Sequence, residues 1–140
     1  MGYTHYIDQK KDCPQEEWEL IGGAFNELRI QGLLTNPLPI QYESDDPSEP
    51  EVNDQHIRFN GIGNDGHETF YVTKAHLNRI NFCKTNYKPY DTTVVALLCF
   101  MHHFAPDVWD ISSDGMSDDW EEGLKLARTV LPQCKGIYDE

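Results

Sequence analysis

The stretch from Phe82 to Phe104, FCKTNYKPYDTTVVALLCFMHHF, constrains the fold most, because it contains the most apolar part of the chain. Eight consecutive apolar residues, Val94 to Met101, are followed by two histidines and Phe104 without an intervening Gly or Pro. A run of this length favours a helix of about four turns over a strand. Pro89 suits the first helical position and Pro106 ends the helix, so we expect a central buried helix over about 89–104.

The rest of the sequence predicts an α+β fold in a single domain, residues 1–140, with a long acidic loop at about 35–54. Alternating aromatic and polar residues predict strands at 2–7, 56–61, 67–73, 77–85 and 108–112. Tyr3, His5 and Ile7 would share one face of the first strand. The order of elements favours a mostly antiparallel sheet of about four to five strands, with about three helices packed on one face.

Two further helices are predicted from apolar residues spaced three or four apart. The first would begin near Cys13 and Pro14 and end at Gly32, with the apolar stripe Trp18, Ile21, Phe25 and Leu28. The paired Gly22 and Gly23 would allow another backbone to approach closely. The last helix would begin near Asp118, whose side chain would cap it, and end at Pro132.

The net charge of −13 is confined to two segments. One lies in the proline-rich stretch 35–54, where we expect an acidic loop without regular structure. The other lies between 107 and 122. Together they hold thirteen of the 24 acids and no Lys or Arg, so the remaining eleven acids equal the eleven basic residues. The two sets are Glu43, Asp45, Asp46, Glu49, Glu51 and Asp54, and Asp107, Asp110, Asp114, Asp118, Asp119, Glu121 and Glu122.

This charge distribution excludes several classes of function. Binding to phosphates needs clustered cations, which the chain lacks, so we expect no direct contact with nucleic acid. A basic protein surface or a metal cation is a better match.

No apolar run is long enough to span a bilayer and the start has no signal-peptide pattern, so we expect a cytoplasmic protein without membrane contact. The four cysteines form no C-x-x-C pair and are expected to be free thiols.

One candidate site for a small ligand follows the strand expected at 77–85. Lys84, Thr85 and Lys88 lie between a strand end and a helix N-terminus, where anions bind readily. With Asn60, Tyr90 and Asp91 they would form a polar pocket for a nucleotide-like ligand. The alternative is that Thr85 and Asp91 only cap the turn and the helix.

A second candidate site is a possible calcium loop. Residues 110–121 fit a twelve-residue EF-hand loop, with Gly115 at its sixth position and ligands Asp110, Ser112, Asp114, Asp118 and Glu121. Ser117 replaces the usual aliphatic residue, and a strand precedes the loop where an EF-hand has a helix. A plain turn before an acid-rich helix explains the same residues.

Catalytic patterns are weak. Gly61 to Gly66 matches G-x-G-x-x-G, but no helix follows it, so we interpret it as a hairpin turn. We identify no convincing nucleophile and base, and the sequence favours a non-enzymatic protein, with no catalytic residues assigned.

Five blocks spread over the chain carry a resemblance. They are MGYTHY at the start, FNG at 59–61, ETF at 68–70, FCKT…KPYD at 82–91 and SDG…DW..G at 113–123. In these the chain resembles an uncharacterised family of small proteins encoded by tailed bacteriophages and prophages, although Ile7 stands where the family usually has Trp. The resemblance implies a phage accessory protein in the cytoplasm of an infected bacterium.

Together these observations predict a protein that acts by binding, as an acidic inhibitor of a host defence or nucleic-acid enzyme. Carboxylates would imitate DNA phosphates in front of a basic groove. The expected partner-binding residues are those of the acidic loop, Glu43, Asp45, Asp46, Glu49, Glu51 and Asp54. Binding of a nucleotide-like ligand and a calcium-stabilised structural module are the alternatives.

Overall fold

The structure, a computed structural model, describes residues 3–35, 40–77 and 80–139. Its described residues form three α-helices and seven strands, in the α+β class that the sequence predicts. In chain order the elements are β1 (Thr4–Gln9), α1 (Gln15–Thr35), β2 (Ile40–Gln41), β3 (Glu51–Val52), β4 (His56–Gly61), β5 (Phe70–Thr73), β6 (Asn81–Lys84), α2 (Asp91–Phe104), β7 (Trp109–Ser113) and α3 (Ser117–Arg128).

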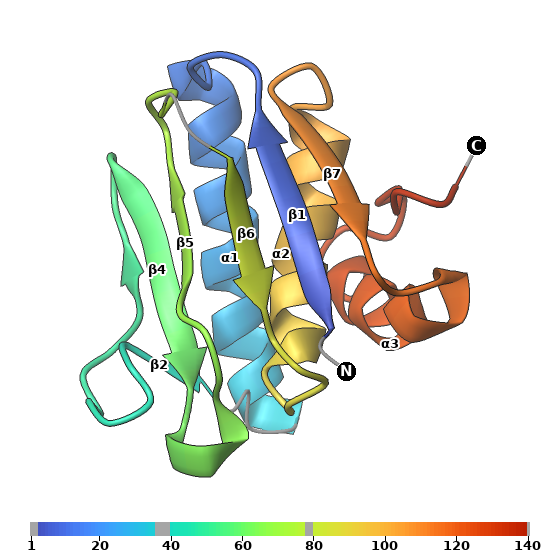
Figure 1. The fold of residues 1–140 in the computed structure, drawn as a ribbon. Helices are drawn as coiled ribbons and strands as arrows, with labels where there is room; N and C mark the ends of the chain where they lie inside the picture. The colour runs from blue at the N-terminus through green and yellow to red at the C-terminus, as the bar shows by residue number, and fades with distance from the viewer. Residues whose placement is uncertain (1–2, 36–39, 78–79, 140) are drawn as a thin grey trace.

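The strands form two antiparallel sheets that lie edge to edge. One sheet has the order β6-β1-β7, and in the other β4 pairs with β2, β3 and β5. At the seam the Glu68 N–H donates to Lys84 O at 3.2 Å, and the Asn81 side-chain amide donates to Tyr71 O at 2.8 Å. As a result β4, β5, β6, β1 and β7 run side by side as one layer, with α1 and α2 behind it (Figure 1).

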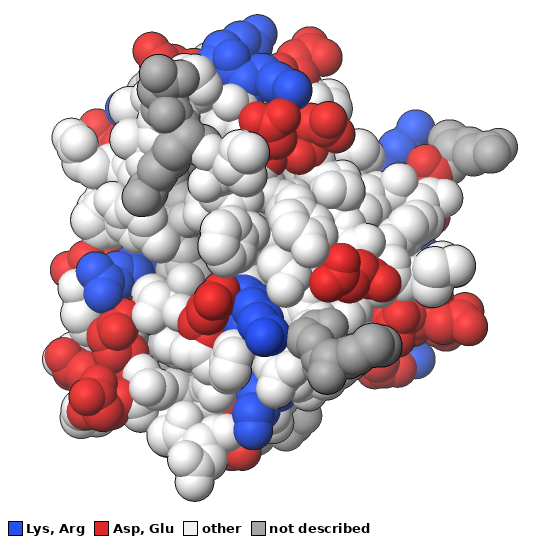
Figure 2. Space-filling view, viewed as in Figure 1, with Lys and Arg blue, Asp and Glu red and all other residues white. Residues whose placement is uncertain are grey.

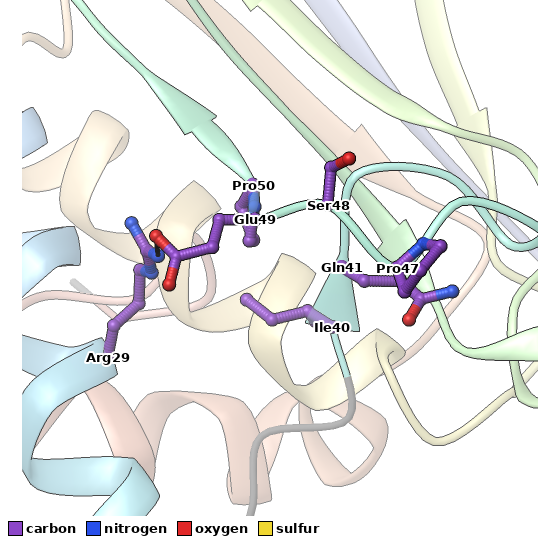
Figure 3. A pocket seen from close by; sticks show the side chains of 7 residues that line it. All are labelled: Arg29, Ile40, Gln41, Pro47, Ser48, Glu49 and Pro50. Atoms are coloured by element: carbon purple, nitrogen blue, oxygen red, sulfur yellow. Dashed lines mark ion pairs between the residues drawn. The ribbon is translucent and has the colours of Figure 1, made fainter.

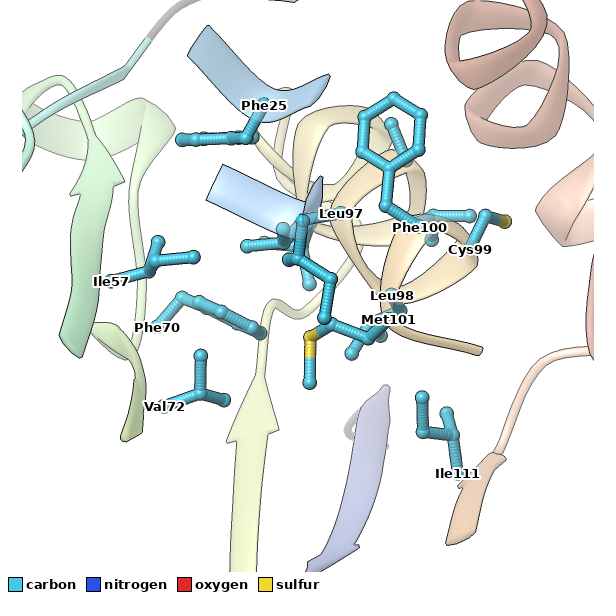
Figure 4. Packing of buried hydrophobic residues seen from close by; sticks show 14 of the residues in the cluster. Phe25, Ile57, Phe70, Val72, Leu97, Leu98, Cys99, Phe100, Met101 and Ile111 are labelled. Carbon is cyan, nitrogen blue, oxygen red and sulfur yellow. The ribbon is translucent and has the colours of Figure 1, made fainter. Parts of the chain in front are cut away.

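Helix α2 is the centre of the core, as its apolar run predicts. Its residues from Thr93 to Met101 are all buried. Leu97 and Met101 lie between Phe25 of α1 and the sheet residue Phe70 (Figure 4). The predicted stripe of α1 is buried as well, because a helix on a sheet must remove one apolar face from water. The inner faces of the sheet and of α1 therefore enclose α2.

Several predicted boundaries are wrong by a few residues. Helix α2 begins at Asp91 instead of Pro89, α1 continues past Gly32 to Thr35, and α3 ends at Arg128 instead of Pro132. Helix α3 also begins one residue before Asp118. The predicted cap at Asp118 is wrong as well, because the capping carboxylate is that of Asp119, three residues after Met116, which accepts the Met116 N–H at 2.8 Å. The expectation that Gly22 and Gly23 meet another backbone is also wrong.

The acidic segment is more regular than predicted. Two short strands, β2 and β3, lie inside it, and both pair with β4. The prediction of a loop without regular structure is wrong for these two strands. Their pairing partner is β4, which lies outside the segment, so the pattern of the segment alone does not show the pairing. Positions 36–39 of the segment, like 1–2 and 78–79 of two predicted strands, lie outside the described residues.

In the part of the chain that the structure describes, no helix is both long enough and apolar enough to cross a bilayer.

Candidate functional site

One face of the sheet is left uncovered by the described elements, since α1 and α2 both lie on the other face (Figure 1). Side chains alternate along a strand, so the residues between the buried ones of β1 and β6 point to this open face. Tyr6 and Phe82 are register partners there, and they are 40% and 53% exposed. On the other side of β1, Ser112 of β7 lies opposite Tyr6. Two aromatic rings therefore stand next to each other in water.

Carboxylates of the segment 107–122 lie beside this open face. Among the described residues, no Lys, Arg or His nitrogen comes within 4.0 Å of any of its seven carboxylates. Asp114 accepts the Thr4 N–H at 3.1 Å and the Tyr6 hydroxyl at 3.2 Å, which fixes it next to the ring. Partial desolvation and this hydrogen bond raise the pKa of Tyr6. In Figure 2 the middle of the open face is largely uncharged, and acidic side chains gather near β7 and α3.

The acidic segment around 43–54 is different, because the protein's own cations contact it. Glu43 meets Arg58 at 2.9 Å and accepts the Thr69 hydroxyl at 2.6 Å. Partial burial would raise the pKa of Glu43, but the hydrogen bonds from Thr69 and Arg58 outweigh it and hold that pKa below its ordinary value. Two other acids of the predicted partner-binding set meet a cation, Glu49 with Arg29 at 3.8 Å and Asp54 with Lys74 at 3.4 Å, and Glu51 lies 2.7 Å from the His56 imidazole.

A cavity of about 230 Å³ lies where this acidic segment meets α1. Figure 3 shows Arg29 of α1 directed toward Glu49, with Ile40 and Pro50 beside the ion pair. Arg29, which lines the cavity, is already paired with Glu49, which lines it as well. The segment is thus held to α1 partly by charge.

Five residues of the predicted ligand pocket, between 84 and 91, are linked by hydrogen bonds, and Asn60 is separate from them. The Asn60 side chain binds the backbone of its own hairpin, through Gly61 N–H, His67 N–H and His67 O. The Tyr90 hydroxyl lies 2.5 Å from Glu68 O and 3.5 Å from Lys84 O. The Thr85 hydroxyl donates to the Asp91 carboxylate at 2.6 Å, the Lys88 N–H donates to Thr85 O at 3.0 Å, and Lys88 O accepts the Asp91 N–H at 2.8 Å. Lys84 and Lys88 lie half-buried before α2, as the sequence predicts.

A polar network centred on His5 was not predicted from the sequence. The His5 side chain is 0% exposed; its Nδ1 lies 2.8 Å from Ser113 Oγ, and its Nε2 lies 2.7 Å from Asp91 Oδ1. The network ties β1 to the end of β7 and to the start of α2. Alternation predicts that His5 shares the inner face with Tyr3 and Ile7. Its partners are 86 and 108 residues away, and no local pattern identifies them.

The order Ser–His–Asp is that of serine hydrolases, but here every member is used to hold the fold. Ser113 Oγ also accepts the Gly115 N–H at 2.9 Å. The rings of Tyr3 and Trp120 pack edge-on against His5, with centroids 5.0 and 5.4 Å away. A general base must reach a substrate, whereas this imidazole is enclosed on both sides. We therefore interpret the network as structural.

The five residues of the possible calcium loop lie on a strand, a turn and a helix. Asp110 and Ser112 are on β7, Asp114 is bound to Thr4 and Tyr6, and Asp118 and Glu121 are on α3. Within the described ranges, no three His, Cys, Asp or Glu side chains gather as metal ligands would. Calcium binding stays a prediction from the sequence.

All four cysteines are free thiols and buried, as expected for residues inside the core. Burial raises the pKa of Cys13 and of Cys83 to about 12 and that of Cys134 to about 11. Burial also raises the pKa of Cys99. Since the thiolate is the reactive form, none of these side chains is activated as a nucleophile.

Comparison with protein-family models, curated proteins and solved structures gave no match to this chain.

Proposed function

We propose that this protein acts by binding a partner protein with a basic surface, and that the contact is made by the acidic face. We define the acidic face as the seven carboxylates of the segment 107–122, namely Asp107, Asp110, Asp114, Asp118, Asp119, Glu121 and Glu122. The observation that carries the proposal is that no described cation pairs with any of them. In the segment 43–54, by contrast, three of six carboxylates pair with Arg or Lys, and a fourth contacts His56.

Unpaired like charges repel each other in the free protein, and a partner that supplies cations relieves that repulsion. Such a charge distribution raises the rate of association with a basic surface and disfavours acidic partners. Paired carboxylates contribute less, because the protein's own cations already neutralise part of their field. This moves the expected contact from the acidic loop, where the sequence placed it, to β7 and α3.

The resemblance to small phage proteins supports a more specific proposal. The protein acts in an infected bacterium as an inhibitor of a host defence enzyme or an enzyme that binds nucleic acid. Enzymes of this kind present Lys and Arg to phosphates, and the acidic face offers carboxylates in place of the phosphates. The physical basis is charge complementarity alone, so inhibition should weaken as salt screens the charges.

The test is capture of partners from bacterial lysate at low and high salt, comparing two charge-reversal variants. The first replaces exposed residues of the acidic face, in Asp110→Lys/Glu121→Lys/Glu122→Lys. The matched control makes the same change of charge elsewhere, at the exposed Glu19, Asp45 and Asp65.

We expect the wild type and the control to retain one partner at low salt, and the acidic-face variant to lose it. Circular dichroism establishes that both variants are folded. Equal capture by the two variants, or no partner at either salt concentration, would contradict the proposal.

A further inference from the structure

The open face of the sheet has an aromatic centre. Tyr6 and Phe82 are opposite each other on β1 and β6, at a cross-strand spacing that brings side chains into contact. Ile80, which is 76% exposed, precedes β6 on the same chain segment. Figure 2 shows the middle of this face as largely uncharged surface. Exposed apolar residues that gather on one face often mark a binding site.

Carboxylates border the aromatic pair on the β7 side. Asp114 is hydrogen-bonded to the Tyr6 hydroxyl, and Asp110 lies opposite Asp8, two residues along β1 from Tyr6. Diagonal neighbours in an antiparallel sheet are about 7–8 Å apart, within reach of one long side chain. Of these acids only Asp8 meets a cation among the described residues, Lys10 at 2.7 Å. Asp110 and Asp114 thus make no ion pair within 4.0 Å among the described residues, although Lys10 interacts electrostatically with Asp110, and Lys84 shares the open face two residues along β6 from Phe82.

We propose that this face binds arginine side chains of a partner protein, with guanidinium groups stacked on Tyr6 and Phe82 and paired with Asp110 and Asp114. Arginine fits both halves of the surface, because its planar guanidinium stacks on aromatic rings and forms two parallel hydrogen bonds with a carboxylate. Lysine is a strongly hydrated point charge and gains less from the rings.

Charge decides between the possible occupants of the face. A nucleic acid would bring phosphates to the edge formed by Asp110 and Asp114, and a second copy would bring another chain of net charge −13. Both are repelled. A basic protein surface is attracted to the rim and covers the aromatic centre. This inference rests on the proposed function and adds the residue type that is recognised and the strands that recognise it.

The experiment measures binding of two peptide probes, nona-arginine and nona-lysine, by calorimetry at equal ionic strength, with oligothymidylate as a third probe. The variant is Phe82→Ala, which removes an exposed ring, and the control is Leu20→Ala, which removes an exposed side chain, 50% accessible, from α1. A stacked guanidinium contributes about two- to fivefold in affinity per exposed ring.

We expect the arginine peptide to bind at least about fivefold more tightly than the lysine peptide, since two rings contribute. Phe82→Ala should remove about half of that preference, Leu20→Ala should leave it unchanged, and oligothymidylate should not bind. Equal affinity of the two peptides, with no effect of Phe82→Ala, would overturn the arginine inference and leave the proposed function standing. Binding of neither peptide would overturn both, and binding of oligothymidylate would overturn the choice of partner.

Discussion

The contact between α2 and α3 gives the sharpest prediction on the fold, through Gly123. This glycine is buried, and a Cβ built on it would lie 2.3 Å from Val95 Cγ1, 2.5 Å from Val95 Cβ and 3.1 Å from Thr92 O. Carbon atoms in contact prefer about 3.5–4.0 Å, so Gly123→Ala must push the two helices apart or rotate Val95. Val95 is β-branched and buried, which leaves it little freedom to rotate.

The expected loss follows from two opposing effects. Overpacking costs about 1–3 kcal/mol, and replacing Gly by Ala inside a helix returns about 1 kcal/mol. We therefore expect Gly123→Ala to lower the free energy of unfolding by roughly 0–2 kcal/mol. Gly23→Ala in α1 is the matched control, because a Cβ there has no neighbour within 4 Å. It should raise stability by about 0.5–1 kcal/mol.

Urea denaturation at pH 7 with linear extrapolation measures both variants. A third protein, Gly123→Ala/Val95→Ala, should lose less than the sum of its single variants, since removing Val95 Cγ1 takes away the 2.3 Å contact, while the 2.5 Å contact with the Cβ of residue 95 stays. If Gly123→Ala were as stable as Gly23→Ala, the close approach of α2 and α3 would be refuted.

Three further predictions concern buried polar groups. His5→Ala should lower the free energy of unfolding by about 1–3 kcal/mol, because it removes the imidazole that contacts both Ser113 and Asp91, while the exposed His67→Ala should change it by less than about 0.5 kcal/mol. Chemical denaturation that ranks the two variants equally would contradict the network. Glu43→Gln should destabilise the fold at pH 7, and the difference from wild type should shrink below the ordinary value of 4.5, because a lowered pKa stabilises the fold only above that range. Denaturation at several pH values, with the exposed Asp45→Asn as the matched control, checks the sign. The four thiols should react with Ellman's reagent at pH 8 only after denaturation, because burial raises their pKa, and rapid reaction of the native protein would show an accessible thiol.

Local patterns predicted most of the fold. The apolar run 94–101 predicted the buried helix because no other element has enough apolar residues to lie fully inside. Alternation placed His5 on the inner face of β1. Strands β2 and β3 were missed because each has two residues in a segment rich in proline and acids, and their pairing depends on β4, which lies outside that segment.

The functional surface was only partly predictable. The sequence identified both acidic segments, but their pairing with cations depends on contacts between distant residues, such as Arg58 with Glu43. It placed Phe82 in a strand, but which face of that strand is covered depends on where α1 and α2 pack. Asn60 is separate from the other five residues of the predicted ligand pocket for the same reason, since it lies on β4 and Asp91 lies on α2.

The central claim is that the contact surface consists of the open sheet face and the acidic face, and that the segment 43–54 is not part of it. An amide chemical-shift map of the ¹⁵N-labelled protein during titration with nona-arginine tests this directly. We predict that the largest shifts fall on β6, β1, β7 and the first turns of α3, with small changes from 43 to 54. Shifts centred on 43–54, or spread evenly over all the acidic residues, would contradict it.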